Sequence, residues 1–263
     1  MKKSFHNSLC TILLLVATFC FSAQALCAPL QKLATPPQTL EPYHFSLKSI
    51  PKHAWGDIRQ TFWSKNGVVL ILGSASALAL LPMDESLSDK RIADPLFSKN
   101  LNRGLDTAFS TYALGGASAV TFLIGTQTHN NKFKLMSESL AEAWVFTEAM
   151  VTLGKVTVQR TRPNGDNYSM PSNHSAASFS IATVLTEYYG LKAAIPAYTV
   201  ASVVAFSRVD GGYHYLTDVL VGAVLGTTIG MGVSEFHKHE FSDFLILPQI
   251  TPDGVVLGVS KSF

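Results

Sequence analysis

Three short segments of the sequence combine residue types that could bind and cleave a phosphate group. Each contributes at least one basic residue or histidine, and together they supply three permanent cations, two histidines and one carboxylate. In chain order these residues are Lys155, Arg162, Ser172, Asn173, His174, Arg208, His214 and Asp218. Three permanent cations in one pocket would repel a metal ion but would suit a phosphate. The sequence therefore predicts an anion site if the fold brings the three segments together.

The first two segments are predicted to contribute cations and a helix N-terminus. Lys155 and Arg162 are seven residues apart, so on a continuing helix they share one face, and Pro163 would end that helix. Ser172 is predicted to cap the next helix, whose free N–H groups and dipole favour an anion. His174 would lie in that first turn and face the anion. Each segment alone also fits a structural role without a ligand. The first could be a solvated basic helix end, and the second a capped helix with a surface histidine.

The third segment is predicted to contribute a nucleophile. His214 and Asp218 are four residues apart at the start of another predicted helix, which follows Gly211 and Gly212. At this spacing Asp218 can take the proton on one ring nitrogen and leave the other free to attack. A structural His–Asp pair is the simpler alternative. A metal site made of His174, His214 and Asp218 is another, and the three cations argue against it.

The N-terminus predicts export. Lys2 and Lys3 precede a short apolar run and the small residues Ala23-Gln24-Ala25, which is the pattern of a signal peptide covering residues 1–25. The apolar run is shorter than a membrane span requires, although an uncleaved anchor is an alternative. Removing the two lysines takes the formal net charge from +2 to 0, so charge gives no argument for nucleic-acid binding.

Beyond the signal peptide the chain divides into three parts. Residues 26–44 contain several prolines and predict an extended tether. Residues 45–240 are expected to form the domain, and residues 241–263 a C-terminal tail. Cys27 is the one cysteine beyond the signal, so no intrachain disulfide can form. A lipid-modified N-terminus at Cys27 is an alternative that the preceding residues fit poorly.

The domain is predicted to be all-α. Six apolar helical stretches are expected, with a further short helix in the more polar region 84–107. The six run roughly over Val68–Leu81, Tyr112–Thr126, Ser139–Val156, Ser175–Tyr189, Ala193–Phe206 and Thr217–Val233. Most are short for independent membrane spans. We therefore expect a compact helical bundle that rests on or lies partly in a membrane, with a six-span protein as the alternative.

Two flanking segments have their own patterns. In the segment 45–65, Trp55, Ile58 and Phe62 recur at helical spacing, which fits either a helix in a membrane interface or a helix packed on the domain. Near the C-terminus, two β-like runs joined by a turn at residues 251–254 predict a short hairpin. The remaining histidines, including His53 and His237, are expected in polar or solvated surroundings.

Taken together, the three segments resemble the pattern of the type 2 phosphatidic acid phosphatase (PAP2) superfamily, K-x6-R-P, P-S-G-H and S-R-x5-H-x3-D. That superfamily includes lipid phosphate phosphatases, class A acid phosphatases and vanadium haloperoxidases. Every fixed position agrees except Asn173, where the family has glycine. Asn is the residue that next best tolerates a positive φ, so we expect the site to survive with a narrower pocket. The resemblance implies a six-helix PAP2-like bundle, to which the C-terminal β-hairpin is an appendage.

The resemblance also implies a role for each site residue. His214 would be the nucleophile that forms a phosphohistidine, and Asp218 would orient it. His174 would protonate the leaving oxygen and then activate water. The residues that would bind the phosphate and stabilise its transition state are Lys155, Arg162, Arg208, Ser172 and Asn173. These cations replace the metal ion of other phosphatases, so no cofactor or metal is expected.

Three functions remain open from the sequence. The leading one is hydrolysis of a lipid phosphate in the cell envelope, with phosphatidic acid, phosphatidylglycerol phosphate, an isoprenyl diphosphate and lipid A as candidate substrates. The apolar helices, the Trp55 segment and the predicted export to the periplasm favour it. A soluble periplasmic acid phosphatase of broad specificity is the second, and a vanadium-dependent haloperoxidase is the third. The partners expected are thus a phosphorylated lipid and a membrane surface or a partial membrane embedding, while the oligomeric state stays open.

Overall fold

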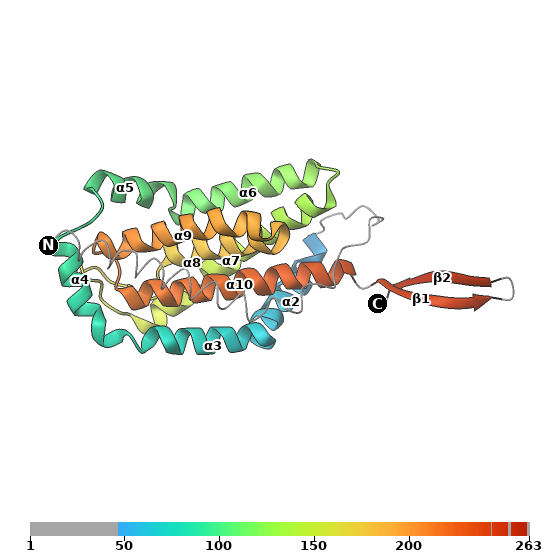
Figure 1. Ribbon diagram of the computed structural model, residues 1–263, viewed down its shortest axis with the longest axis horizontal. Coiled ribbons are helices and arrows are strands. Elements are labelled where there is room, and N and C mark those ends of the chain that lie inside the picture. Colours follow the sequence, from blue (N-terminus) through green and yellow to red (C-terminus); the bar gives the residue numbers. More distant parts are fainter. Residues whose placement is uncertain (1–46, 243, 252–253, 262–263) are drawn as a thin grey trace.

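The computed structural model describes residues 47–242, 244–251 and 254–261, and the larger part of these residues is helical (Figure 1). The predicted signal peptide (1–25) and tether (26–44) lie outside the described residues. The α-helices are α2 (Ile50–Phe62), α3 (Lys65–Leu78), α4 (Asp84–Ala93), α5 (Lys99–Ala108), α6 (Thr111–Gln127), α7 (Asn131–Val158), α8 (Asn173–Tyr189), α9 (Leu191–Asp210) and α10 (Leu216–Ser242). Two short 3-10 helices, Leu47–Ser49 and Leu81–Met83, precede α2 and α4.

The predicted all-helical class is correct, but the predicted count of six helices is wrong. The polar region 84–107 holds two helices, α4 and α5, where one short helix was expected. Several helices are also longer than their apolar runs, because α7 begins at Asn131 and α10 continues to Ser242. Asn130 caps α7 by accepting the N–H of Phe133 (3.0 Å), so the polar first turns belong to the helix. Predicting the helices from their apolar runs therefore underestimated their length.

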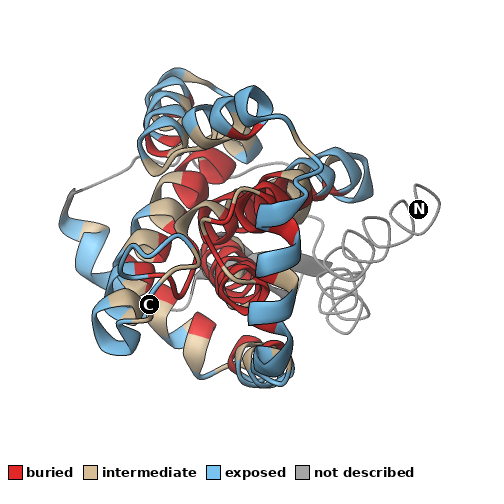
Figure 2. Cartoon of the chain, turned by 90° about the vertical axis from the view of Figure 1, so that its left-hand side faces the viewer, coloured by how far each residue is buried: buried red, intermediate tan, exposed pale blue. Residues whose placement is uncertain are grey.

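α10 is the central helix, packed against α2, α3, α7 and α8, and most of its residues from 216 to 238 are buried. Buried residues gather at the middle of the bundle (Figure 2). Glycines at every fourth position of α10 let its backbone approach α8 closely. A Cβ on Gly222 would lie 2.7 Å from the Ser172 carbonyl oxygen, and one on Gly226 would collide with the Ala176 carbonyl oxygen. This contact presses the start of α8 onto the first turns of α10, where two of the predicted site segments lie.

α2 buries its polar face and exposes its aromatic face. His53, Asp57 and Thr61 are buried against the bundle, whereas Trp55 and Trp63 are 63% and 71% exposed. The helix packs on the domain through these polar side chains and through Phe62, whose ring meets that of Phe146 edge to face, whereas Trp55 and Trp63 face outward. An outward aromatic stripe is typical of a helix at a membrane interface.

Three helical segments are long and apolar enough to cross a membrane by length and composition: Lys65–Ala93, Lys99–Gln127 and Leu216–Lys238. The last of them is α10, which is buried within the bundle. Large apolar side chains on α3 and α6, such as Ile71 and Leu123, are more than 60% exposed. The outer helices thus expose apolar side chains, while the interior combines two apolar clusters with many buried polar side chains.

Two strands follow α10. β1 (Phe244–Thr251) pairs antiparallel with β2 (Gly254–Lys261), in a register that places Phe244 opposite Lys261.

Candidate active site

Four helix ends and one loop converge at the end of the bundle where α4 lies (Figure 1). They are the C-terminal ends of α7 and α9, the N-terminal ends of α8 and α10, and the loop 159–172. Seven of the eight predicted site residues lie on them, and His214 lies in the short turn that joins α9 to α10. The positive charge of Arg162 is near enough to lower the pKa values of Lys155, His214 and Arg208. Segments that are distant in sequence therefore do form one electrostatic site.

Lys155 and Arg162 do not share a helix, contrary to the prediction. α7 ends at Val158, and Gln159 takes a left-handed conformation (φ 50°) that turns the chain away. Arg162 lies in the loop that follows. Lys155 Nζ donates to the Tyr168 carbonyl oxygen (2.7 Å), which ties the helix end to the same loop. Burial and the charge of Arg162 lower the pKa of Lys155 to about 8.

Two polar atoms in this site are buried and lack a hydrogen-bond partner among the residues that the structure describes: Arg162 Nε and Ser172 Oγ. Ser172 occupies the N-cap position of α8, as predicted, but its side chain does not cap the helix. Buried polar groups are nearly always hydrogen-bonded. Ser172 Oγ, at the α8 N-terminus, and Arg162 Nε are therefore atoms of this site that are available to a bound acceptor.

His214 is buried, and its contacts with Asp218 and Ser169 are made by one ring nitrogen, Nδ1. It precedes α10, and its Nδ1 lies 3.7 Å from Asp218 Oδ2 and 3.5 Å from Ser169 Oγ. The predicted contact with Asp218 is present, although 3.7 Å is longer than a hydrogen bond. This orientation turns Nε2 away from the carboxylate. Burial lowers the pKa of His214, which favours the neutral imidazole near pH 7.

Asp218 is fixed by groups that the sequence analysis did not identify. Its Oδ1 accepts from Arg160 (2.8 Å), and its Oδ2 accepts from the Tyr215 N–H (2.9 Å) and from Ser169 Oγ. Arg160 also donates to Asp84 Oδ2 on α4 (2.8 Å). Arg160 and Ser169 lie in the same loop as Arg162, within the spacer positions of the sequence pattern. Only the fold reveals that they reach Asp218.

His174 and Arg208 share a third acidic partner, Asp106 on α5. His174 Nε2 lies 3.2 Å from Asp106 Oδ1, and Arg208 donates to the same oxygen. The Asp106 side chain is 43% exposed, whereas Arg208 is almost fully buried. Burial and the charge of Arg208 lower the pKa of His174 to about 4. His174 lies in the first turn of α8, as predicted.

Asn173 is not in the conformation that the comparison with glycine suggested. It is the first residue of α8 and has a negative φ. Its side-chain Nδ2 donates to Glu148 Oε2 on α7 (2.9 Å), and Glu148 Oε1 accepts from Thr111 on α6 (3.1 Å). Burial raises the pKa of Glu148. Asn173, the residue that departs from the family pattern, thus has Glu148 as its partner, and no local pattern could have identified that partner.

Part of the chain is similar to known proteins. Residues 138–241 match the sequence model of the PAP2 superfamily, a range that includes all eight predicted site residues. A curated relative, the lipid A 1-phosphatase of Porphyromonas gingivalis, is 37% identical over 100 residues, which are 36% of this chain and 22% of the relative. The match thus spans about a fifth of that relative's length.

Two solved structures are similar in fold. The transmembrane PAP2 type phosphatidylglycerolphosphate phosphatase from Bacillus subtilis superposes with a TM-score of 0.51 at 19% identity, over 69% of this chain and 96% of that one. LpxE from Aquifex aeolicus gives a TM-score of 0.47 at 21% identity, over 58% of this chain and 95% of that one. The first of these supports the fold assignment.

Proposed function

Because residues 138–241 of this chain form a PAP2 superfamily domain, we propose that the protein is a phosphatase that hydrolyses a lipid phosphate monoester or diphosphate at the site around His214. The observation that carries the proposal is the pair of unpartnered buried atoms, Arg162 Nε and Ser172 Oγ, beside the α8 N-terminus. A phosphate oxygen would accept from both. Lys155 and Arg208 bring further positive charge to the same place.

The cations and the helix N-terminus would bind the phosphate and stabilise its transition state. Charge spreads over the equatorial oxygens during phosphoryl transfer, so catalysis depends mainly on positioning and on fixed positive charge. Lys155, Arg162 and Arg208 come from three different segments and can contact different oxygens. The backbone N–H groups of Asn173 and His174 add the dipole of α8. No metal ion is needed in this site.

The reaction would proceed in two displacements at phosphorus. His214 Nε2 attacks, the N–P bond forms, and the P–O bond to the lipid breaks as His174 gives its proton to the leaving oxygen. His174 then takes a proton from water, which attacks the phosphohistidine, and phosphate leaves with its oxygen from that water. The contacts of Nδ1 with Asp218 and Ser169 support Nε2 as the attacking atom.

The protonation of His174 fits this sequence of steps once substrate is bound. With a pKa of about 4, His174 is neutral in the free protein near pH 7. A phosphate dianion beside the ring would favour the imidazolium and raise that pKa. His174 would therefore become an acid only when its substrate is present.

Three features favour a lipid over a soluble phosphate ester. The described part of the chain contains three segments that are long and apolar enough to span a membrane. The outward aromatic face of α2 suits a membrane interface. An open apolar cavity of about 370 Å³ lies between α6, α8 and α9, and Ser178, one turn after His174, lines it. An acyl chain in this cavity would leave the phosphate at the site.

The substrate to test first is a lipid A 1-phosphate, because the curated relative carries that name. Phosphatidic acid, phosphatidylglycerol phosphate and an isoprenyl diphosphate complete the set. Phosphate release by the detergent-purified protein would be measured on these four lipids and on p-nitrophenyl phosphate. We expect at least one lipid to exceed the soluble ester in kcat/KM by about tenfold or more, with vanadate as an inhibitor.

Other outcomes would overturn the proposal. Preference for p-nitrophenyl phosphate over every lipid would favour the broad acid phosphatase. Bromide oxidation that depends on vanadate and peroxide would favour a haloperoxidase. No turnover of any phosphate ester by protein that is folded by circular dichroism would remove the enzymatic function.

A further inference from the structure

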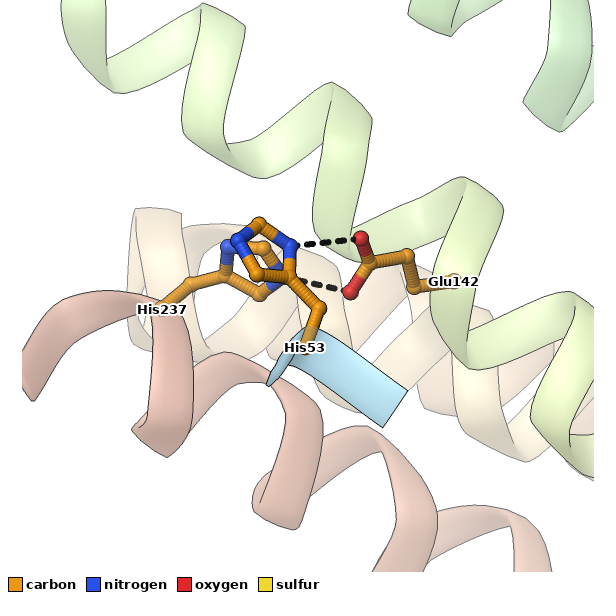
Figure 3. A group of neighbouring side chains, drawn as sticks. All are labelled: His53, Glu142 and His237. Carbon is orange, nitrogen blue, oxygen red and sulfur yellow. Dashed lines mark hydrogen bonds and ion pairs between the residues drawn. The ribbon is translucent and has the colours of Figure 1, made fainter. Parts of the chain in front are cut away.

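A second polar cluster lies at the opposite end of α10 from the phosphate site. It consists of His53 on α2, Glu142 on α7 and His237 on α10, and their side chains converge on the carboxylate of Glu142 (Figure 3). Asp218 and His237 are nineteen residues apart on one helix, which corresponds to about 28 Å. The proposed phosphatase mechanism uses none of these residues.

Both histidines are buried, which corrects the expectation that His237 lies at a solvated helix end. His53 is 2% exposed and His237 is fully buried. His53 Nδ1 lies 3.0 Å from Glu142 Oε1, and His237 Nε2 lies 2.8 Å from Glu142 Oε2. A second carboxylate, that of Glu138 one turn earlier on α7, has its Oε1 3.6 Å from His53 Nδ1. Two imidazoles and two carboxylates from three helices therefore meet in the interior.

We propose that His53, Glu142 and His237 bind a Zn²⁺ ion, with Glu138 beside them, and that the ion fastens α2 to α7 and α10. Two histidines and a glutamate are a common protein ligand set for zinc. Zinc binds neutral imidazole through either ring nitrogen, so Nδ1 of His53 and Nε2 of His237 are both suitable donors.

The ligand atoms lie near the spacing that a tetrahedral ion requires. With metal–ligand bonds of about 2.0–2.1 Å, neighbouring ligand atoms of a tetrahedral zinc site lie about 3.3 Å apart. His53 Nδ1 and His237 Nε2 lie 3.0 and 2.8 Å from different oxygens of Glu142, and one ligand atom from each of the three residues lies within 4.8 Å of the other two. Binding would therefore need the three side chains to rotate so that both nitrogens and a Glu142 oxygen surround the ion.

The charge balance also fits a divalent cation. Two carboxylates and two neutral imidazoles around Zn²⁺ give no net charge, which suits a buried position. Each oxygen of the Glu142 carboxylate already faces an imidazole nitrogen of one of the two histidines. The neighbouring cation Lys238 pairs with Glu187 instead (2.7 Å).

The ion would join the helices where they already lie close together. The ring of Phe236 lies where a Cβ on Gly56 of α2 would be, so α2 and α10 touch beside the cluster. The rings of His53 and His237 meet edge to face, with centroids 5.1 Å apart. α2 buries polar rather than apolar side chains here, and so gains little hydrophobic stabilisation. A metal ion bound by all three helices would stabilise the packing of α2 on α7 and α10.

The test measures metal affinity on the full chain, purified in detergent without a histidine tag and stripped with a chelator. We expect one Zn²⁺ per chain in competition with a chromophoric chelator, a visible Co²⁺ spectrum typical of tetrahedral coordination, and a rise in melting temperature on adding Zn²⁺. His53→Gln and His237→Gln should each weaken binding at least tenfold. The control His129→Gln changes an exposed histidine outside the cluster and should bind as the wild type does.

Two results would overturn the proposal. One is a wild-type protein that takes up no Zn²⁺ or Co²⁺ at micromolar concentrations, which would leave the cluster as a hydrogen-bonded His–Glu–His group only. The other is unchanged affinity in both cluster variants. If a variant does not fold, the proposal is tested on the wild type alone, which must bind one Zn²⁺ per chain and give a tetrahedral Co²⁺ spectrum. Because every readout is binding or stability, the outcome is separate from that of the phosphatase assay.

Discussion

Asn173 Nδ2 donates a hydrogen bond to Glu148 Oε2 at 2.9 Å, linking the first residue of α8 to the middle of α7. Asn173 occupies the position at which the PAP2 pattern has glycine. The contact explains how an asparagine fits there. The side chain is directed to a carboxylate on the neighbouring helix, while the backbone N–H stays at the helix N-terminus for the phosphate.

A double-mutant cycle on Asn173 and Glu148 tests this contact. Hydrogen bonds to charged groups contribute about 1.5–3 kcal/mol, so Asn173→Gly and Glu148→Ala should show a coupling of about 1 kcal/mol or more. Asn173→Gly alone should keep kcat within about tenfold, because the backbone N–H remains. The coupling is measured on kcat/KM and on thermal stability. Strictly additive effects would show that the pair does not act together.

Arg160 and Arg162 are two residues apart but should have different roles. Arg160→Ala would leave Asp84 and Asp218 as buried carboxylates without their shared cation, at a cost in stability of about 3–5 kcal/mol. Arg162→Ala removes a cation whose Nε has no described partner, so the phosphatase activity should fall while the stability changes little. Unfolding midpoints and kcat/KM of both variants measure this. Equal destabilisation by the two changes would contradict the assignment.

Phosphate binding at the site should weaken at alkaline pH because Lys155 loses its charge. Its pKa is lowered from its usual value to about 8, so the cation is present below that pH and is lost as the pH rises through it. Inhibition by inorganic phosphate should therefore weaken above about pH 8, whereas an unperturbed lysine would hold its charge to about pH 10. Lys155→Arg should abolish this dependence, because arginine stays charged. If phosphate inhibition weakened over the same pH range in Lys155→Arg, another group would be responsible for the change.

The close contact of α10 with α8 can be tested by adding a single methyl group. A Cβ at Gly226 would collide with the Ala176 carbonyl oxygen, and backbone cannot yield easily, so Gly226→Ala should destabilise the protein by about 1–3 kcal/mol. Gly116 on α6 has no atom within 4 Å of its Cβ position. Gly116→Ala is thus the matched control and should be neutral or slightly stabilising. Equal melting temperatures would show that the helices can separate.

The sequence could propose site residues because the patterns that single them out are local. The helical runs, the helix start at Ser172 and the turn at Gly211-Gly212 follow from neighbouring residues. The partners supplied across the fold could not be predicted in this way. Asp106, Glu148 and Asp84 belong to other helices, and nothing in their local patterns distinguishes them from surface acids. The same holds for His53 and His237, which looked solvated because each is flanked by polar or charged residues.

The helix boundaries show a related limit. A helix end depends on single residues such as Gln159, whose left-handed conformation no local rule required. The arrangement of Lys155 and Arg162 on one face was wrong for this reason. The prediction that Arg162 and Lys155 lie close together still holds, because the loop brings Arg162 near enough to lower the pKa of Lys155.

The most direct test of the central claim is phosphate release by His214→Ala, measured beside wild type and His129→Ala on the best lipid substrate. The mechanism predicts a loss of at least about a thousandfold in kcat for the first variant and none for the second. It also predicts acid-labile phosphate bound to wild-type protein after rapid quenching, and none on His214→Ala. Turnover by His214→Ala at the wild-type rate would contradict the account.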